Sequence, residues 1–202
     1  MARIDTLDAL RALYGSPSGR ARDKVLARLD AHCRHFIALS PFVLIATSDA
    51  HGAADVSPRG DMPGFVVAEE TRLLIPDRPG NNRIDSLCNI IANAHAGLLF
   101  LIPGVNETLR VNGRAAIHDD EALLARFAVA GRPPRSVITV EVEQAFLHCA
   151  KAFMRSDLWS PLAQLPRTAL PTMGEMLADQ VGHCDPMETQ DQMEQRYRAA
   201  LY

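Results

Sequence analysis

The chain has 202 residues, of which 48% are hydrophobic and 22% charged, and its formal net charge is −3. This length suits one domain with a proper hydrophobic core. The slight negative charge gives no support to binding of nucleic acid or of an acidic membrane surface, because both need a basic face, so any anion site has to be local.

The cysteines and the amino-terminal stretch indicate the compartment. Four cysteines lie far apart and form no C-x-x-C pair: Cys33, Cys88, Cys149 and Cys184. The chain opens without an apolar signal segment, and no run of residues is long and apolar enough to cross a membrane. We therefore expect reduced thiols in a cytoplasmic protein.

Helices are predicted at the start of the chain. Apolar residues recur with helical spacing over residues 4–14 and again from about 21 to 38. Ser40-Pro41 ends the second helix, because a proline disfavours helical geometry at the residue before it. Residues 1–39 are thus expected to form amino-terminal helices.

A β-region is expected over residues 40–160. Runs at 42–47 and 53–57 predict a hairpin, and the Pro- and Gly-rich residues 58–64 predict a loop. Further strands are predicted over residues 65–68, 72–75, 95–102, 108–117 and 137–146. Six or seven strands at hairpin spacing with one inserted helix indicate a mainly β, α+β fold: an antiparallel barrel with flanking helices rather than a parallel α/β sheet.

The residues after the last strand are expected to be mostly helical. A short helix or turn is predicted over 149–159, and three prolines then break the chain. Closing helices are predicted over 173–180 and 187–201. Residues 161–202 are thus a carboxy-terminal helical extension within one structural domain.

One predicted strand, 108–117, carries arginine on a polar face. Its residues alternate with period two, which is typical of a strand buried on one side. The apolar set is Leu109, Val111, Gly113, Ala115 and Ile117, and the polar set is Thr108, Arg110, Asn112 and Arg114.

The stretch from Leu73 to Ile91 predicts a strand, a turn and a helix. Its apolar start breaks at residues 76–80, and a helical stripe follows two asparagines: Ile84, Leu87, Cys88 and Ile91. The first N–H groups of such a helix are unpaired and, with the positive end of the helix dipole, they favour an anion. Arg78 and Arg83 flank the turn, and guanidinium groups suit phosphate oxygens. We interpret the turn as phosphate-binding; a capped helix with two surface arginines explains this stretch equally well.

Common metal and catalytic motifs are missing from the sequence. His32, Cys33 and His35 on a predicted helix, and the run His183-Cys184-Asp185, each offer only a fragment of a zinc site, so no metal is expected. There is no G-x-S-x-G, G-x-G-x-x-G or G-x-x-x-x-G-K-[ST] pattern. The sequence therefore assigns no catalytic residue, and a phosphate site here is of another type.

Several basic residues can converge on the turn. The run 57–61 offers a hydroxyl, a guanidinium and a carboxylate at the end of a strand. Four arginines can line one cleft across neighbouring strands, although unrelated surface positions are the simpler reading: Arg59, Arg78, Arg83 and Arg110. Three residues after the last strand can approach such a cleft, with packing or an interface as the plain explanation for the tryptophan: Lys151, Arg155 and Trp159.

Four segments occur in a characteristic order and spacing: SPRGDMPGF (57–65), PDRPGNNRIDSL (76–87), GLLFLIPGVNETLRVNG (97–113) and HCAKAFMRSDLW (148–159). Together they resemble the pyridoxamine 5′-phosphate oxidase-like family of FMN-binding split-barrel flavoproteins. The resemblance covers roughly residues 40–161. It implies a six-stranded antiparallel Greek-key split β-barrel that forms a homodimer, with two FMN molecules at the subunit interface.

The resemblance also implies cofactor-binding residues. The phosphate side would be the segment that contains Asp77, Arg78, Asn81, Asn82 and Arg83. The flavin ring and ribityl chain would approach Ser57, Pro58, Arg59 and Gly60. Arg110 falls at a ring or phosphate contact on a later strand. The segment with Lys151, Arg155 and Trp159 resembles the one that reaches the flavin of the partner subunit.

This chain departs from the vitamin-forming oxidases at two places. Asn82-Arg83 stands where those enzymes have an adjacent Arg-Lys pair, and residues 161–202 replace their substrate-binding stretch. The resemblance therefore implies an FMN-dependent oxidoreductase that acts on an unidentified small substrate. Since flavin carries the redox chemistry, no acid, base or nucleophile motif is required. Two alternatives remain open: a non-enzymatic flavin or haem binder, with His148 as the nearest axial ligand, and a deazaflavin-dependent reductase.

Overall fold

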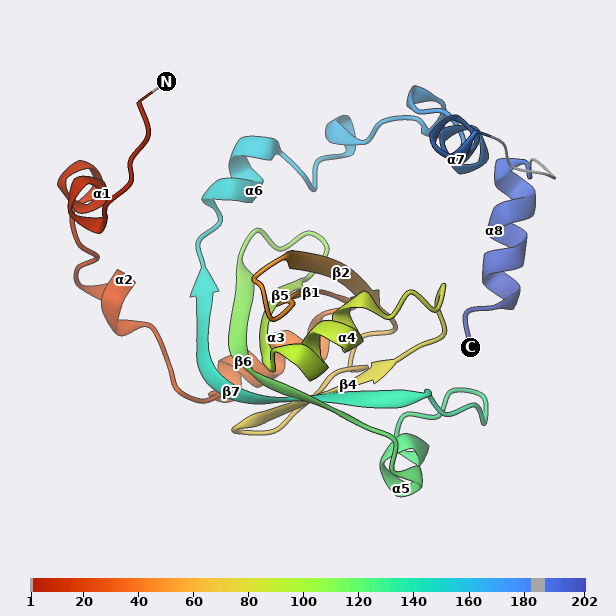
Figure 1. The fold of residues 1–202 in the computed structure, drawn as a ribbon, viewed down its shortest axis with the longest axis horizontal. Helices are drawn as coiled ribbons and strands as arrows, with labels where there is room; N and C mark the ends of the chain where they lie inside the picture. The colour runs from red at the N-terminus through yellow and green to blue at the C-terminus, as the bar shows by residue number, and fades with distance from the viewer. Residues whose placement is uncertain (1, 183–187) are drawn as a thin grey trace.

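The computed structural model describes residues 2–182 and 188–202, and a curved antiparallel sheet lies at its centre (Figure 1). The sheet has seven strands in the order β2-β1-β5-β6-β7-β4-β3. The strands are β1 (Phe42–Ser48), β2 (Ala54–Gly60), β3 (Val67–Ala68), β4 (Arg72–Asp77), β5 (His95–Leu101), β6 (Thr108–His118) and β7 (Ser136–His148). The prediction of a mainly β, α+β fold with flanking helices is confirmed.

The expected six-stranded barrel is wrong in two respects. The sheet has seven strands, and it is open among the described strands, with β2 and β3 at its edges. β3 has only two residues and pairs with β4 alone. β2 contains Pro58, which has no N–H for a ladder and is tolerated on an edge strand.

The first hairpin forms as predicted but is longer. The Asp49 carboxylate accepts hydrogen bonds from the N–H groups of His51 and Ala53, each at 2.8 Å, and so shapes the turn between β1 and β2. Residues 58–60, expected in a loop, continue β2, and Arg59 pairs with Val43 of β1. Arg59 is thus held on a strand rather than on a loop.

The hydrophobic core lies between the sheet and two helices, α3 (Ala31–Leu39) and α4 (Asp85–Ala92). Val43, Phe100 and Leu109 are fully buried on the covered face of the sheet. Each such side chain contributes roughly 1.5–3 kcal/mol through its burial. The predicted faces of β6 are confirmed for most of its length, because Leu109 is buried whereas Arg110 is exposed. Thr108, which was expected on the polar face, is buried.

The predicted helix over 21–38 is wrong, because the chain forms two shorter helices there. α1 (Leu7–Tyr14) precedes them, and α2 (Arg20–Asp23) ends well before α3. Between α2 and α3, Leu26 exchanges two backbone hydrogen bonds with Ala145 of β7, which extended backbone can make and helical backbone cannot. Asp30 then caps α3 by accepting from the Cys33 N–H.

The predicted apolar stripe of α4 is mostly exposed in this chain. Ser86 and Ile90 are the buried residues of the helix. Ile84 just before the helix is 54% exposed and Ile91 is 81% exposed, and only Leu87 of the stripe packs partly against the core. The helix is where the pattern predicted it, but it turns a different face to the sheet.

Residues after β7 leave the sheet and return to it. This segment contains the helices α6 (Lys151–Ser156), α7 (Met173–Val181) and α8 (Gln190–Ala199), with 3₁₀ turns at Pro161–Ala163 and Arg167–Ala169. The remaining helix, α5 (Glu121–Ala125), lies earlier in the chain, between β6 and β7. Figure 1 shows that the last residues come back beside the loop between β4 and α4. Helices near the predicted 173–180 and 187–201 are confirmed, although residues 183–187 lie outside the described part, as do His183, Cys184 and Asp185.

Two further observations concern the whole described chain. No helix within residues 2–182 and 188–202 has the length and apolar character needed to span a membrane. Cys33, Cys88 and Cys149 are free thiols, and Cys33 is buried.

Candidate functional site

A cleft of about 250 Å³ opens where the β4–α4 turn meets β2 and the start of β7. Five of the predicted cofactor residues line it: Arg59, Asp77, Arg78, Asn81 and Asn82. Arg135 and Ser136, which sequence reasoning did not select, complete the charged and hydroxyl lining. Three guanidinium groups from separate segments therefore share one small cleft.

The covered face of β2 is polar, in contrast to the other strands. Asp55, Ser57 and Arg59 are the partly buried residues of β2, and residues between them are exposed. Arg59 pairs with Val43, and Ser57 with Ile45, so these polar side chains share a face with core residues. A strand that turns polar groups inward breaks the usual rule of patterning, and such exceptions are expected at functional sites.

Arg59 is held inside the cleft by its own strand and by β4. Its Nη1 donates to Ser57 Oγ at 2.7 Å, and its Nη2 lies 3.6 Å from Asp77 Oδ1. Arg59 and Asp77 are only 23% and 18% exposed. The Arg59 Nε is buried and has no hydrogen-bond partner among the described residues. An unpaired buried donor of a charged group is costly, so this atom calls for an acceptor from a ligand.

Asp77 is the acidic member of the cleft. Burial raises the pKa of its carboxyl, while the charges of Arg59 and Arg135 oppose that rise. Arg135 also donates from Nη1 to Asn82 Oδ1 at 3.0 Å, which joins the start of β7 to the turn. The arginines thus outnumber the carboxylate that faces them.

Arg78 is fixed on one side by protein acceptors. Its Nε donates to Asp61 Oδ2 at 2.8 Å, and its Nη1 donates to the Phe127 carbonyl oxygen at 2.7 Å. Asp61 is 4% exposed and Arg78 16% exposed. No described residue accepts from Nη2, so that nitrogen is the part of this guanidinium left for a ligand.

The turn itself has an unusual backbone. Asn82 and Ile84 both have positive φ angles, 59° and 52°. For a β-branched residue such as Ile84 this is a strained conformation, and strain of this kind is concentrated at binding sites. No described side chain caps the start of α4, so its first N–H groups stay available to an acceptor. The predicted uncapped helix start is therefore present.

The other predicted residues of the turn and of β2 are placed differently. Arg83 points its guanidinium at Asp85, 2.9 Å away, and at 73% exposure it does not line the cleft. The Ser57 hydroxyl accepts from Arg59, while Pro58 and Gly60 are exposed residues of β2.

Arg110 lies on the opposite face of the sheet. Arg110 of β6 pairs with Leu99 of β5, Leu99 pairs with Leu44 of β1, and Leu44 pairs with Pro58 of β2. Arg110 is therefore three strands away from β2, a distance of roughly 14 Å across the sheet. Residues opposite one another across strands share a face, and Arg59 faces the other way from its neighbour Pro58. One chain therefore does not bring Arg59 and Arg110 together.

The residues predicted after β7 also lie outside the cleft. Lys151 and Arg155 are exposed on α6. Trp159 donates from Nε1 to the Val105 carbonyl oxygen at 2.9 Å and stacks on Phe153, with ring centroids 5.6 Å apart. In this chain Trp159 fastens the α6 region to the β5–β6 connection.

His148 belongs to a basic cluster on the outer face at the end of β7. The Arg110 guanidinium lies 5.3 Å, and the Lys24 Nζ 5.1 Å, from the centroid of the Phe146 ring. The His148 ring contacts the same ring in a tilted arrangement, with centroids 5.1 Å apart. His148 Nε2 is buried and has no hydrogen-bond partner among the described residues. Burial, and then the charges of Arg110 and Lys24, lower the pKa of His148.

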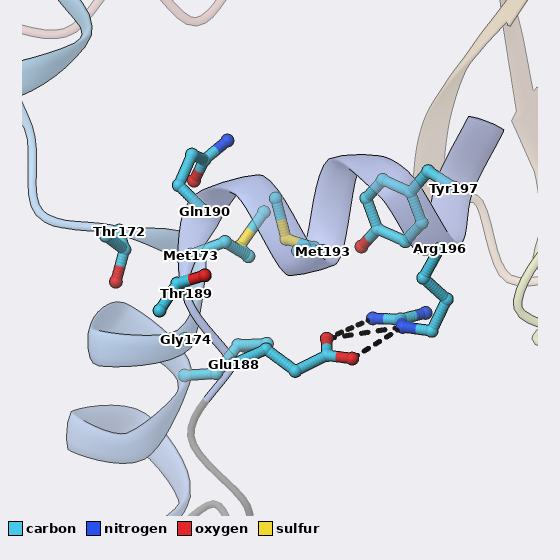
Figure 2. Close-up of a pocket in the computed structure, with 10 residues that line it drawn as sticks. Thr172, Met173, Gly174, Glu188, Thr189, Gln190, Met193, Arg196 and Tyr197 are labelled. Carbon is cyan, nitrogen blue, oxygen red and sulfur yellow. Dashed lines mark hydrogen bonds and ion pairs between the residues drawn. The ribbon is translucent and has the colours of Figure 1, made fainter.

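Two other hollows contain none of the predicted site residues. A groove of about 610 Å³ runs beside α4 and is lined by Ile90, Ile91, Ser136 and residues 115–119 of β6 and its end. A hollow of about 200 Å³ separates α7 from α8, where Met173, Met193 and Tyr197 face one another (Figure 2). Within the described ranges no three His, Cys, Asp or Glu side chains gather as ligands for a metal.

Comparison with known proteins gives a family match. Residues 29–149 match the family model described as pyridoxamine 5′-phosphate oxidase. No curated protein matches the chain.

Several solved structures are similar to part of the chain at low identity. HupZ from Group A Streptococcus has 21% identity and a TM-score of 0.46, covering 58% of this chain and 92% of its own. General stress protein 26 from Bacillus anthracis has 14% identity and a TM-score of 0.43, with 57% and 93% covered. HutZ, the heme storage protein from Vibrio cholerae, has 15% identity and a TM-score of 0.41, with 60% and 94% covered.

Proposed function

The chain belongs to the pyridoxamine 5′-phosphate oxidase family, and from that premise we propose that it is an FMN-dependent oxidoreductase that acts on a small substrate. The observation that carries the proposal is the cleft in which Arg59, Arg78 and Arg135 meet the uncapped start of α4. This arrangement suits a phosphate monoester, and FMN is a flavin that ends in one.

The residues of the cleft fit the phosphate end of FMN. Arg59 Nε lacks a protein acceptor, and Arg78 is anchored through Nε and Nη1 with Nη2 left over. Guanidinium donors held in fixed positions bind phosphate oxygens well, because little side-chain freedom is lost when the ligand arrives. The flavin would supply hydride or electron transfer, while the protein holds the phosphate and orients the ring.

We propose that two chains form the complete site. Ile84, just before α4, is exposed at the cleft, and Ile91 of α4 is exposed at the groove beside the helix. A second subunit would cover both side chains. Arg110, Lys151, Arg155 and Trp159 lie away from the cleft of their own chain and would reach the flavin bound by the partner. The site is then at the interface of a homodimer.

The first experiment is an absorbance spectrum of the purified full-length protein, followed by release and identification of any coloured compound. FMN at about one molecule per chain supports the proposal, and a nicotinamide-dependent reduction assay then tests for turnover. A colourless protein that FMN cannot reconstitute contradicts it.

The same spectrum tests the two alternatives. A Soret band would indicate haem, and the unpaired Nε2 of His148 would then be the nitrogen to test as an axial ligand. A protein that binds deazaflavin but not FMN would indicate the deazaflavin-dependent reductase.

A further inference from the structure

The described residues of the carboxy-terminal extension, 161–182 and 188–202, are called the strap here, and the end of the strap contacts Asp61 and Arg78 beside the cleft of its own chain. Within the strap, α7 and α8 each begin with a capping box, and Glu188 accepts hydrogen bonds from the Arg196 guanidinium (Figure 2). No residue of either helix is buried. Neither helix packs extensively on the sheet or on the other helix, so the attachment of this segment to the rest of the chain depends on a few contacts.

Tyr202 makes several of these contacts. Its phenol donates to Asp61 Oδ1 at 2.6 Å, and the other carboxylate oxygen, Oδ2, accepts from Arg78 Nε at 2.8 Å. The Arg78 guanidinium carbon also lies 5.6 Å from the centroid of the Tyr202 ring. Arg132 donates to the main-chain oxygen of Tyr202. One side chain thus contacts both members of the buried Asp61–Arg78 pair.

We propose that Tyr202 is a positioning residue for the cofactor phosphate: it fixes Asp61, Asp61 fixes Arg78, and Arg78 presents Nη2 to the phosphate. The proposal rests on the function proposed above and adds that the strap supports the cleft of its own subunit through Asp61 and Arg78. Tyr202 itself does not line the cleft. Its effect on the ligand is therefore indirect.

The hydrogen bonds of the Asp61 carboxylate explain how the Tyr202 phenol can orient Arg78. A carboxylate has two oxygens, and at Asp61 Oδ1 takes the Tyr202 phenol and the Met62 N–H, while Oδ2 takes Arg78. With both oxygens occupied, the carboxylate cannot rotate without breaking hydrogen bonds, and the guanidinium inherits that fixed orientation. Preorganised donors bind more tightly because less freedom is lost on binding.

The shifts in the pKa values of Asp61 and Tyr202 agree with this geometry. Burial alone would raise the pKa of Asp61, but the hydrogen bonds from Tyr202, Met62 and Arg78 lower it overall. The hydrogen bond to Asp61 raises the pKa of Tyr202. At neutral pH the pair is therefore a phenol that donates to a carboxylate, which is the arrangement that holds Arg78.

The test compares FMN with riboflavin, which lacks the phosphate. Dissociation constants are measured by flavin fluorescence for the full-length apoprotein and for Tyr202→Phe, which keeps the ring and removes only the hydroxyl. Tyr197→Phe on α8 is the matched control, since its ring lies over Arg196 and away from the cleft. We expect Tyr202→Phe to weaken FMN binding by roughly three- to tenfold, the effect of one hydrogen bond, and to leave riboflavin binding and the control unchanged.

Two outcomes overturn the inference while the proposed function stands. In the first, the wild-type protein prefers FMN over riboflavin and Tyr202→Phe keeps that preference in full. In the second, Tyr202→Phe weakens both flavins equally, which would show that the tyrosine only anchors the strap. A wild-type protein that binds no FMN contradicts the proposed function and the inference together.

A double-mutant cycle tests the route through Asp61. In the Asp61→Asn variant the carboxylate through which the Tyr202 phenol orients Arg78 is absent. Adding Tyr202→Phe to that variant should therefore change the affinity for FMN little further. Additive losses, each as large as in the wild-type background, would show that Tyr202 and Asp61 act separately and would contradict the proposed route.

Discussion

The cleft and the outer basic cluster use the same residue types in opposite ways. In the cleft, Arg59 and Arg78 lie mostly buried against carboxylates, with hydrogen bonds to the protein that fix each guanidinium. In the cluster, Arg110 is exposed and lies over the Phe146 ring, beside Lys24 and His148. The first set is held by carboxylates before any ligand binds, whereas Arg110 in the second set rests on an aromatic ring and has no carboxylate partner among the described residues.

This difference follows from the two faces of one sheet. Arg59 is on the covered face of β2 and Arg110 on the opposite face of β6, three strands away. A single chain therefore has a prepared phosphate site and a separate basic surface. In the proposed homodimer the surface of one chain would complete the cleft of the other, so each region has a different variant that tests it.

The largest expected effect is the loss of Arg59, the arginine that β2 holds in the cleft beside Asp77. Arg59→Ala should weaken FMN binding by roughly 1.5–3 kcal/mol, the range for a hydrogen bond to a charged group. Riboflavin binding should change far less. Arg28→Ala is the matched control, because Arg28 is 68% exposed and pairs with Glu70. Equal losses for FMN and riboflavin would show that Arg59 does not contact the phosphate.

The second prediction concerns the outer face and the dimer. If Arg155 serves the partner's flavin, Arg155→Ala and Arg59→Ala should each reduce FMN binding, and dimers that contain one subunit of each variant should regain one intact site. Random mixing of equal amounts makes half of the dimers mixed, so about a quarter of the sites should recover, as isologous symmetry requires. Flavin content after unfolding and refolding the mixture measures this. If the mixture recovers no flavin binding, Arg59 and Arg155 serve a site that lies within one chain.

Much of the fold could be predicted because period two is a local signal. The alternation at 108–117 correctly identified the buried face of β6, since its neighbours on both sides supply the same core. The continuous helix over 21–38 failed for a non-local reason, the backbone pairing of Leu26 with Ala145, which is 119 positions away by the difference of the two residue numbers. The prediction that the apolar stripe of α4 faces the core failed, because a sequence pattern shows that a helix face is apolar without showing what covers it.

The site divides in the same way. The turn at 76–83 was recognisable from its Pro, Gly and Asn residues, and Arg59 from the polar run that ends β2. Arg135 and Tyr202 were missed, because each acts through a partner that is distant in sequence, Asn82 and Asp61. The placement of Arg83 beside Asp85 depends on a rotamer, about which sequence spacing carries no information.

Arg83 allows a sharper comparison within the turn itself. Its ion pair with Asp85 is exposed, and such pairs contribute at most about 1 kcal/mol, so Arg83 can leave Asp85 at small cost when a phosphate arrives. We expect Arg83→Ala to weaken FMN binding by about 1 kcal/mol, less than Arg59→Ala, because an exposed side chain loses more freedom on binding. Titration of both variants with FMN under the same salt conditions checks the order. A larger loss for Arg83→Ala would show that the ligand, rather than the free protein, sets the geometry of the turn.

The smallest expected effect is a pH dependence at the outer cluster. The pKa of His148 is lowered in the folded protein by burial and by Arg110 and Lys24, so the unfolded chain binds a proton more readily than the folded one. The free energy of unfolding therefore has its full value above about pH 6.5, the ordinary pKa of histidine. It decreases as the pH falls from there through the lowered pKa of His148 in the folded protein. His148→Gln should therefore flatten the acid side of the stability profile, measured by urea unfolding between pH 5 and 8. His51→Gln, in the exposed β1–β2 turn, is the control. An unchanged acid slope in His148→Gln would show that the enclosed imidazole is not the group that titrates, and that the cluster tolerates one more positive charge.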